Sequence, residues 1–412
     1  MVDEQEKMSV QTQLESSRPG FSARLAGWLK LFFASWVWQH LLFPFITSRL
    51  VLTLIAWFGQ YFIANPGYDR YIQKGYFLST YFPIDIWSRW DTIWYLSIVK
   101  NGYVPSANLT TTYTNLAFFP LFPDLVRLIT LPFPIKASSV SIYLAVGLLI
   151  SNLFFLAAAY LLYKMIVQIL HDEGIAQRAI LLMIAFPAGF FFSTFYPESL
   201  FLFLAVALFY AGLRKRWLLA ALCGALAAIT RPQGVLLGLP LAWMYMEARG
   251  WKLRAIRADV VSFLLFPIFL AGHWIELYAV TGDWLALFHA QAAWGRFSSL
   301  FLGNLIQQLS SAYLYPFRVD IGLYLVFIAA TVFALFKLPS KAFGISALAM
   351  LTMPLLSGLW FSLSRYLVTI FPVFIVLGWA TRRREVYILL LAFFIALQAI
   401  YFFGWTGYYF IA

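Results

Sequence analysis

Long apolar stretches alternate with short polar or basic segments along most of the chain. A helix needs roughly 20 mostly apolar residues to cross the hydrocarbon core of a bilayer. Eleven stretches approach or reach that length, so we predict an all-α, multi-spanning membrane protein. The expected spans lie near residues 41–64, 138–163, 179–196, 198–213, 217–230, 235–247, 260–280, 320–336, 342–358, 361–380 and 386–404.

Several of the spans between residues 179 and 247 are shorter than a full crossing. Pro187, Pro197 and Pro232 fall within or between them, and a proline removes a backbone donor and interrupts a helix. Polytopic proteins tolerate such breaks where neighbouring groups satisfy the freed backbone. We therefore expect broken or kinked helices in this part of the chain.

The composition supports the membrane assignment. Of the 412 residues, 62% are hydrophobic and only 11% are charged, whereas soluble domains carry about 25% charged residues. A soluble chain this apolar could not cover its own surface, so the excess must face lipid. The single cysteine, Cys223, excludes an internal disulfide and a cysteine-based metal site.

The net charge of +12 is distributed as short basic clusters between the apolar stretches. With the N-terminus in the cytoplasm, the inner segments hold 18 of the 29 lysines and arginines, in agreement with the positive-inside rule. Such clusters set orientation and contact anionic membrane lipids. We predict no nucleic-acid partner. The inner segments are the N-terminal arm, Lys164–Arg178, Arg214–Arg216, Arg249–Arg257, Lys337–Lys341 and Arg382–Arg384.

This orientation gives a cytoplasmic arm (1–40), one transmembrane catalytic domain (41–404) and an outer tail (405–412). The longest outer loop, 65–137, is expected to carry interfacial helices. Polar residues that are unusual for a membrane protein then collect at the outer face, where we expect the active site. These residues are Asp91, Glu198, Arg231, Asp283, His289, Arg296 and Arg365.

Apolar side chains recur every three to four residues within the first outer loop. The spacing predicts an amphipathic helix lying in the interface, with tryptophan at headgroup depth. Asp91 lies beside this stripe, where its carboxylate could remove a proton from a sugar hydroxyl. It could equally pair with Arg89 or cap a turn. The stripe consists of Trp87, Trp90, Trp94 and Ile98.

Two prolines three residues apart interrupt the segment Phe118-Phe119-Pro120-Leu121-Phe122-Pro123. They predict a re-entrant or surface turn against the outer leaflet. Farther along, Glu198 stands at a span boundary beside Pro197, where an acid is costly unless it is used or paired. Glu198 could bind a sugar hydroxyl, orient a base or pair with Arg231.

Arg231 and Arg365 both lie at the outer ends of spans. A guanidinium offers a planar donor fork that suits phosphate, and either arginine could instead pair with an outer carboxylate. Arg49 lies deeper in the first span, where it could reach the interface, pair internally or contact a lipid phosphate. The four histidines are scattered without metal-ligand spacing. The sequence also lacks the fingerprints of nucleotide-binding loops.

Five short motifs in order resemble the PIG-V-type mannosyltransferases, which add the second mannose in GPI anchor synthesis, and their bacterial relatives. The likeness covers roughly residues 45–380. The motifs are Arg89-Trp90-Asp91-Thr92-Ile93-Trp94-Tyr95 with Asn101-Gly102-Tyr103, then Phe118-Phe119-Pro120-Leu121-Phe122-Pro123, Tyr196-Pro197-Glu198-Ser199-Leu200, Arg231-Pro232-Gln233-Gly234 and Ser364-Arg365-Tyr366.

This resemblance implies a GT-C fold and an inverting transfer of a hexose, expected to be mannose. The donor would be a polyprenyl- or dolichyl-phosphate sugar, and the acceptor a lipid-linked or glycan hydroxyl, at the non-cytoplasmic face. Asp91 is implied as the general base and Glu198 as an auxiliary acid. Donor or phosphate binding is implied for Arg231, Arg365, Arg89, Tyr366 and Gln233, and substrate positioning for Trp90, Trp94 and Tyr95.

The chain departs from the eukaryotic members in one respect. Eukaryotic members tend to carry an acid between the Trp-Asp stretch and the Phe-Phe-Pro stretch, whereas no Asp or Glu lies between Asp91 and Asp124 here. This argues against a second carboxylate in that stretch and against a bound divalent metal, so we assign no certain cofactor. The short loops resemble a bacterial member, which would place the protein in the plasma membrane. A eukaryotic member would lie in the endoplasmic reticulum.

Two other classes of function fit a polytopic chain. A transporter or flippase of lipid-linked sugar predicts ionisable residues near mid-membrane and a repeat that relates two halves. Arg49 and Glu276 are the deep ionisable residues here, and we find no repeat. A scaffolding protein would not need Glu198, Arg231 and Arg365 on one side. The sequence therefore favours the transferase.

Overall fold

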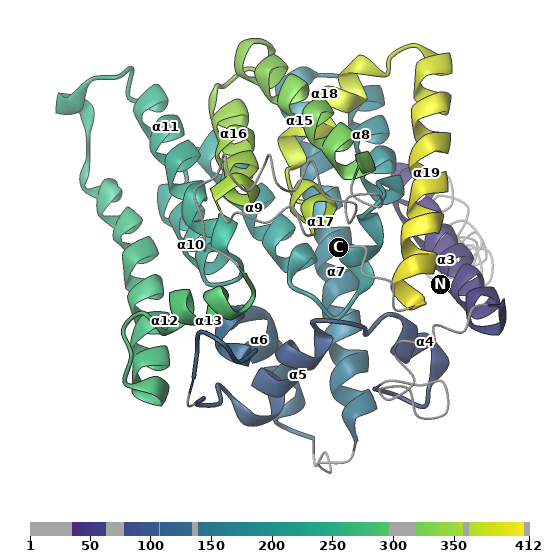
Figure 1. The fold of residues 1–412 in the computed structure, drawn as a ribbon. Coiled ribbons are helices and arrows are strands. Elements are labelled where there is room, and N and C mark those ends of the chain that lie inside the picture. Colours follow the sequence, from purple (N-terminus) through teal and green to yellow (C-terminus); the bar gives the residue numbers. More distant parts are fainter. Residues whose placement is uncertain are drawn as a thin grey trace, which may run out of the picture.

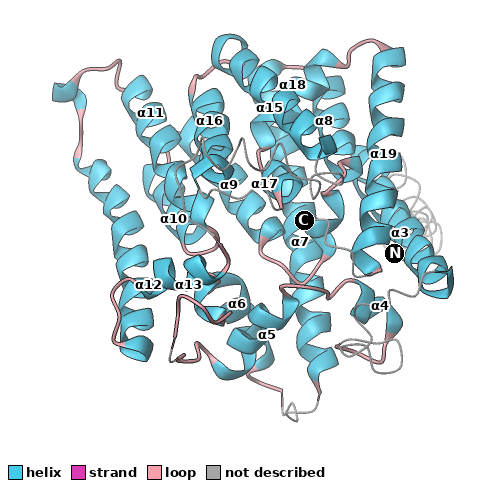
Figure 2. Cartoon of the chain, in the orientation of Figure 1, coloured by secondary structure: helices cyan, strands magenta, loops and turns pink. Residues whose placement is uncertain are grey.

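A computed structural model describes residues 35–62, 78–106, 108–133, 139–295, 318–356 and 362–407. All regular structure in these ranges is helical (Figure 2), which confirms the predicted all-α class. Most of the predicted N-terminal arm, part of the first outer loop and most of the predicted C-terminal tail lie outside the described residues. Five helices are long and apolar enough to cross a membrane: Val37–Gly59, Val140–Leu170, Ala258–Thr281, Val319–Lys337 and Arg384–Thr406.

The long helices follow the predicted spans closely. Shorter apolar helices accompany them within the described ranges, and the count of eleven spans stays a prediction. The long helices are α3 (Phe43–Phe62), α7 (Val140–Leu170), α12 (Leu265–Thr281, preceded by the 3-10 helix η8 at Ala258–Leu264), α15 (Arg318–Lys337) and α19 (Arg384–Thr406). The shorter ones are α9 (Glu198–Leu213), α10 (Trp217–Ala228), α16 (Ala342–Leu356) and α18 (Phe371–Ala380).

Three predicted spans are broken into two helical pieces each, as the prolines in the first two suggest. Helix α8 covers Glu173–Ala185 and gives way after Pro187 to the 3-10 helix η5 (Gly189–Ser193), which is the kind of break expected for this part of the chain. The 3-10 helix η6 (Pro232–Leu237) precedes α11 (Gly238–Ala248). The short α17 (Leu363–Leu367) precedes α18, which has Pro372 in its first turn.

Side chains from distant helices satisfy the backbone at the break after α8. The Gln398 amide nitrogen donates to the carbonyls of Ile184 and Phe186, both at 2.8 Å. Arg49 donates from Nη2 to the Gly189 carbonyl and from Nε to Ser193 Oγ, each at 2.7 Å. Of the alternatives for Arg49, the structure therefore supports internal bonding. Irregular backbone is tolerated at membrane depth only when it is satisfied in this way.

Small residues allow the central helices to approach closely. Helix α9 packs against both α7 and α10, and α8 packs against α18. At Gly378 of α18, an added Cβ would come within 2.6 Å of the Ile175 carbonyl of α8, so any larger residue would push these helices apart. Arg178 fixes the same contact by donating to the Gly378 carbonyl. Such small-residue contacts are typical of helix association in lipid.

The two ends of the bundle differ in character (Figure 1). The loops from α11 to α12 and from α18 to α19, which hold the predicted inner basic clusters, lie at the upper end. The short helices α4 (Phe82–Ile86), α5 (Thr92–Asn101) and α6 (Leu121–Thr130) of the first outer loop lie at the lower end. The segments that we predicted to be inner and outer are thus separated by the bundle.

Candidate functional site

Four charged side chains from four distant segments form one ion-pair network. Asp91 directly precedes α5, Glu198 begins α9, Arg231 lies between α10 and η6, and Arg365 belongs to α17. Arg365 Nη1 lies 2.7 Å from Asp91 Oδ2, and Arg365 Nε donates to Glu198 Oε1. Arg231 Nη1 lies 2.5 Å from the same Glu198 oxygen. The four residues that the sequence singled out are therefore in contact.

Glu198 is the centre of this network. Its side chain is completely buried. Oε1 accepts a hydrogen bond from Arg365 Nε and forms an ion pair with Arg231. Glu198 Oε2 has no hydrogen-bond partner among the described residues. Of the alternatives for Glu198, the structure favours the pairing with Arg231 and adds Arg365. A buried carboxylate between two arginines fixes their position and balances their charge.

Asp91 is the more accessible acid. About a quarter of its side chain is exposed (26%), and one oxygen is held by Arg365. The carboxylate neither caps α5 nor pairs with Arg89. Instead, the backbone carbonyl of Asp91 accepts from the amides of Trp94 and Tyr95. The second carboxylate oxygen forms no hydrogen bond or ion pair with the described residues.

Arg89 has a different partner from the one we considered. Its guanidinium pairs at 2.7 Å with Asp85, one helical turn earlier, and both side chains are completely buried. Asp85 also accepts from the backbone amides of Leu78 and Ser79. The pair therefore braces the turn before Asp91, and the geometry gives no support to the expected phosphate contact of Arg89.

The predicted tryptophan helix is wrong at its start. Helix α5 begins only at Thr92, and Trp90 has a positive φ of 54°, so residues 87–91 form a turn. Trp87 is not on the same helix face as Trp94, because its indole donates to Thr53 and packs on Phe402. These tertiary contacts override the helical spacing. Trp94 does lie on α5, stacked on Phe118 and edge-on to Trp294.

Aromatic rings lie against the guanidinium groups of Arg365 and Arg231. The Arg365 guanidinium carbon lies 4.4 Å from the centroid of the Tyr196 ring, and that of Arg231 lies 5.6 Å from the Tyr366 ring. Tyr95 meets Tyr196 edge-on. Desolvated guanidiniums gain from such ring contacts, so Tyr366 and Tyr95, both expected site residues, lie beside the ion-pair network.

The turn that carries Arg231 is tightly packed. At Gly234, an added Cβ would come within 2.0 Å of the Ala227 carbonyl, which only glycine allows. Gln233, in the same turn, is completely buried, and both polar atoms of its amide lack a hydrogen-bond partner among the described residues. Such a group is rare in folded proteins, so Gln233 offers an unpaired donor and acceptor in the turn that carries Arg231.

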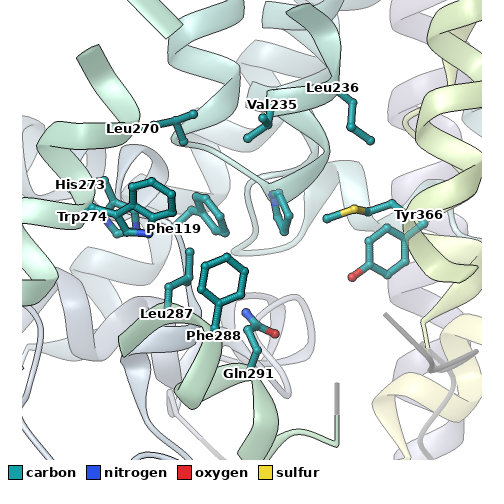
Figure 3. A pocket seen from close by; sticks show the side chains of 12 residues that line it. Phe119, Val235, Leu236, Leu270, His273, Trp274, Leu287, Phe288, Gln291 and Tyr366 are labelled. Atoms are coloured by element: carbon teal, nitrogen blue, oxygen red, sulfur yellow. The ribbon is translucent and has the colours of Figure 1, made fainter. Parts of the chain in front are cut away.

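An apolar cavity of about 300 Å³ lies beside the network (Figure 3). Tyr366 lines it on one side, and His273 and Trp274 of α12 line it on the other. Leu287 and Phe288 come from α13 (Ala286–Ala293). Tyr366 therefore belongs both to the cavity and to the surroundings of Arg231. The remaining lining residues are Phe119, Pro232, Val235, Leu236, Leu270, Gln291 and Met353.

The other polar residues expected at the outer face are not part of the network. Asp283 and His289 pair with each other at 2.6 Å, and the hydrogen bond from His289 holds the pKa of Asp283 below its ordinary value. Arg296 lies outside the described residues. Within the described ranges, no three His, Cys, Asp or Glu side chains gather closely enough to hold a metal ion.

Two residues of the site had no sequence signal of their own. Two carboxylates lie close enough in sequence to pair with Arg89: Asp85, four residues before it, and Asp91, two residues after it. We missed Asp85 because the conformation of the turn decides which of the two is the partner. Tyr196 was noted only as part of a motif. Its hydroxyl binds backbone groups more than 100 positions away in sequence, which no local pattern reveals.

Comparison with known proteins gives consistent matches. A family model described as "Mannosyltransferase (PIG-V)" matches residues 42–249, slightly more than half of the chain. GPI mannosyltransferase 2 from Drosophila pseudoobscura pseudoobscura is 32% identical over 169 residues, which is 38% of this chain and 35% of the relative. GPI alpha-1,6-mannosyltransferase 2 from Rattus norvegicus is 34% identical over 155 residues, 36% and 29% of the two chains. The match thus covers about a third of each relative.

Among solved structures, the oligosaccharyltransferase of Archaeoglobus fulgidus in complex with zinc and sulfate aligns with 88% of this chain and 53% of its own. The TM-score is 0.44 and the sequence identity is 15%. The apo form of the same protein aligns with a TM-score of 0.42 and 14% identity, over 89% of this chain and 56% of its own.

Proposed function

The chain belongs to the PIG-V mannosyltransferase family, and on that premise we propose that it transfers mannose from a polyprenyl- or dolichyl-phosphate donor at the non-cytoplasmic face. The acceptor is a hydroxyl of a lipid-linked or glycan molecule. The reaction is an inverting displacement of the GT-C class. The observation that carries this proposal is the ion-pair network of Asp91, Arg365, Glu198 and Arg231.

In the proposed reaction, the acceptor oxygen attacks the anomeric carbon of mannose. The bond from that carbon to the phosphate oxygen breaks, and the lipid phosphate leaves with the electron pair. Asp91 accepts the proton of the hydroxyl through its free oxygen. Inversion follows because the nucleophile and the leaving group lie on opposite faces of the sugar.

Arg365 and Arg231 supply positive charge where the leaving phosphate gains negative charge. Guanidinium donors that are already oriented cost no reorganisation at the moment of reaction. Glu198 is completely buried, so we assign it to holding both arginines rather than to proton transfer with substrate. This refines its expected role as an auxiliary acid.

The apolar cavity suits the lipid part of the donor. Its lining is almost entirely hydrocarbon and aromatic, and it ends at Tyr366 beside Arg231. A polyprenyl chain seated there would place its phosphate near the arginines. Binding energy from a chain remote from the reacting carbon can be used to orient the phosphate and sugar.

The test is transfer of radiolabelled mannose from polyprenyl-phosphate mannose to endogenous lipid in membranes that contain wild type, Asp91→Asn or no protein. We expect label that depends on the wild-type chain and falls on the order of 100-fold or more with Asp91→Asn, as for loss of a general base. Asp283→Asn is the matched control, because Asp283 is an outer acid paired with His289.

Two outcomes would contradict the proposal. Full transfer by Asp91→Asn would remove Asp91 as the base. Absence of label with wild type, although the chain is present and folded, would remove polyprenyl-phosphate mannose as the donor. Other lipid-phosphate sugars, and then a flippase assay, would follow.

A further inference from the structure

The backbone of Asp91 is held on both sides by specific hydrogen bonds. On the C-terminal side, its carbonyl accepts from the first amides of α5, those of Trp94 and Tyr95. On the N-terminal side, its amide donates at 2.8 Å to the hydroxyl of Tyr196. None of these bonds involves the carboxylate, so the backbone is fixed while the side chain stays available.

The Tyr196 hydroxyl performs two functions at once. It accepts from the Asp91 amide, and its own proton is donated at 3.1 Å to the carbonyl of Arg89. One phenol thus bridges the two ends of the Arg89–Asp91 turn. This is the turn in which Trp90 adopts the left-handed region with φ 54°. A bulky residue in that region persists only where its surroundings hold it.

The Tyr196 ring is itself immobilised. The side chain is 1% exposed. Its ring meets Tyr95, Phe191 and Trp405 edge-on. The Arg365 guanidinium lies over it at 4.4 Å. Tyr196 also stands two residues before Glu198, so one short segment carries one acid of the network and binds the backbone of the other.

We propose that Tyr196 is the positioning residue for the general base: its hydroxyl fixes the Arg89–Asp91 turn so that the Asp91 carboxylate faces the acceptor. This inference rests on the proposed function. Arg365 holds one carboxylate oxygen from the side-chain end, and Tyr196 holds the backbone end. Together they direct the free oxygen, and a displacement of the base by about 1 Å is enough to cost roughly 100-fold in rate.

The substitution Tyr196→Phe removes only the hydroxyl. We measure kcat and the apparent KM for polyprenyl-phosphate mannose with the full-length chain in membranes, per folded molecule. We expect kcat to fall roughly 10- to 100-fold with KM unchanged, because the donor contacts stay in place. The matched control is Tyr324→Phe, which removes another buried hydroxyl that donates to a backbone carbonyl, that of Leu351.

Asp91→Asn is measured in parallel. If Asp91→Asn is inactive and Tyr196→Phe has the wild-type kcat, the positioning role is overturned while the proposed function stands. If Asp91→Asn is active, both fail. A rise in KM with unchanged kcat would also overturn the proposal, since it would place Tyr196 in donor binding.

A second variant covers the case in which Tyr196→Phe does not fold. Installing 3,5-difluorotyrosine at position 196 retains the hydroxyl and makes its oxygen a weaker acceptor for the Asp91 amide, while its proton becomes a stronger donor to the Arg89 carbonyl. We expect an intermediate kcat at unchanged KM. A kcat equal to that of wild type would contradict the inference.

Discussion

At the scale of single residues, the site depends on charges that are shared rather than paired one to one. One oxygen of Glu198 forms ion pairs with two arginines, and Arg365 donates to two acids. The sequence could identify these residues because ionisable groups are rare in such an apolar chain. It could not identify their partners, since Asp91 and Arg365 are 274 positions apart. Arg89 shows the same limit at short range, because its partner Asp85 was not among the alternatives considered.

Replacing Glu198 by Gln should therefore affect both stability and activity. Removing one partner from a buried ion pair leaves an uncompensated charge and typically costs about 3–5 kcal/mol. We expect a lower thermal midpoint in detergent and loss of mannose transfer. The control is Glu247→Gln, an exposed acid that accepts from Ser340, for which we expect a change within about 0.5 kcal/mol. Equal midpoints for the two variants would mean that Glu198 does not hold the arginines.

At the scale of helices, three of the four charged residues of the network lie at interruptions. Glu198 follows the break after α8, Arg231 precedes η6, and Arg365 belongs to the short α17. Proline positions predicted the first two breaks, and hydrophobic pattern predicted the long helices. The turn at residues 87–91 was not predictable from periodicity, because the contacts of Trp87 with Thr53 and Phe402 come from distant helices.

The cavity between helices gives a prediction about chain length of the donor. Leu270→Trp on α12 should fill part of the cavity and displace the lipid. We expect the lipid chain of the donor to lose the burial of two CH₂ groups, at about 0.8 kcal/mol each. This loss raises the apparent KM for the donor roughly 10-fold. The effect should appear with a long polyprenyl donor and be smaller with a two-isoprene donor. Ile268→Trp is the control, because Ile268 lies on the same helix and is 59% exposed. The same rise for both variants would argue against a lipid in the cavity.

At the scale of the whole molecule, the bundle separates basic loops from the short helices of the first outer loop (Figure 1). Charge distribution predicted this separation, since the positive-inside rule acts on short loops. Segment lengths could not settle the number of spans, because the central helices are interrupted. Side chains such as Gln398 donate to the backbone carbonyls that the interruptions leave without a helical partner.

The orientation can be tested with single cysteines. The one native cysteine, Cys223, is buried in α10 and should not react. In intact cells, a membrane-impermeant maleimide should label Thr111→Cys in the first outer loop. Leu253→Cys, in the basic loop after α11, should be labelled only after permeabilisation. The reverse pattern would place the ion-pair network on the cytoplasmic side.

With that orientation, the length of α9 gives the depth of Glu198 in the membrane. Its 16 residues run from Glu198 to the basic turn at Arg214 and rise about 24 Å at 1.5 Å per residue. The hydrocarbon core is about 30 Å thick. If Arg214 lies at the inner headgroups, Glu198 lies about 6 Å below the outer edge of the hydrocarbon. The sugar would then be transferred within the leaflet rather than above it. An acceptor anchored in the same leaflet arrives there by lateral diffusion, whereas a soluble one would have to descend.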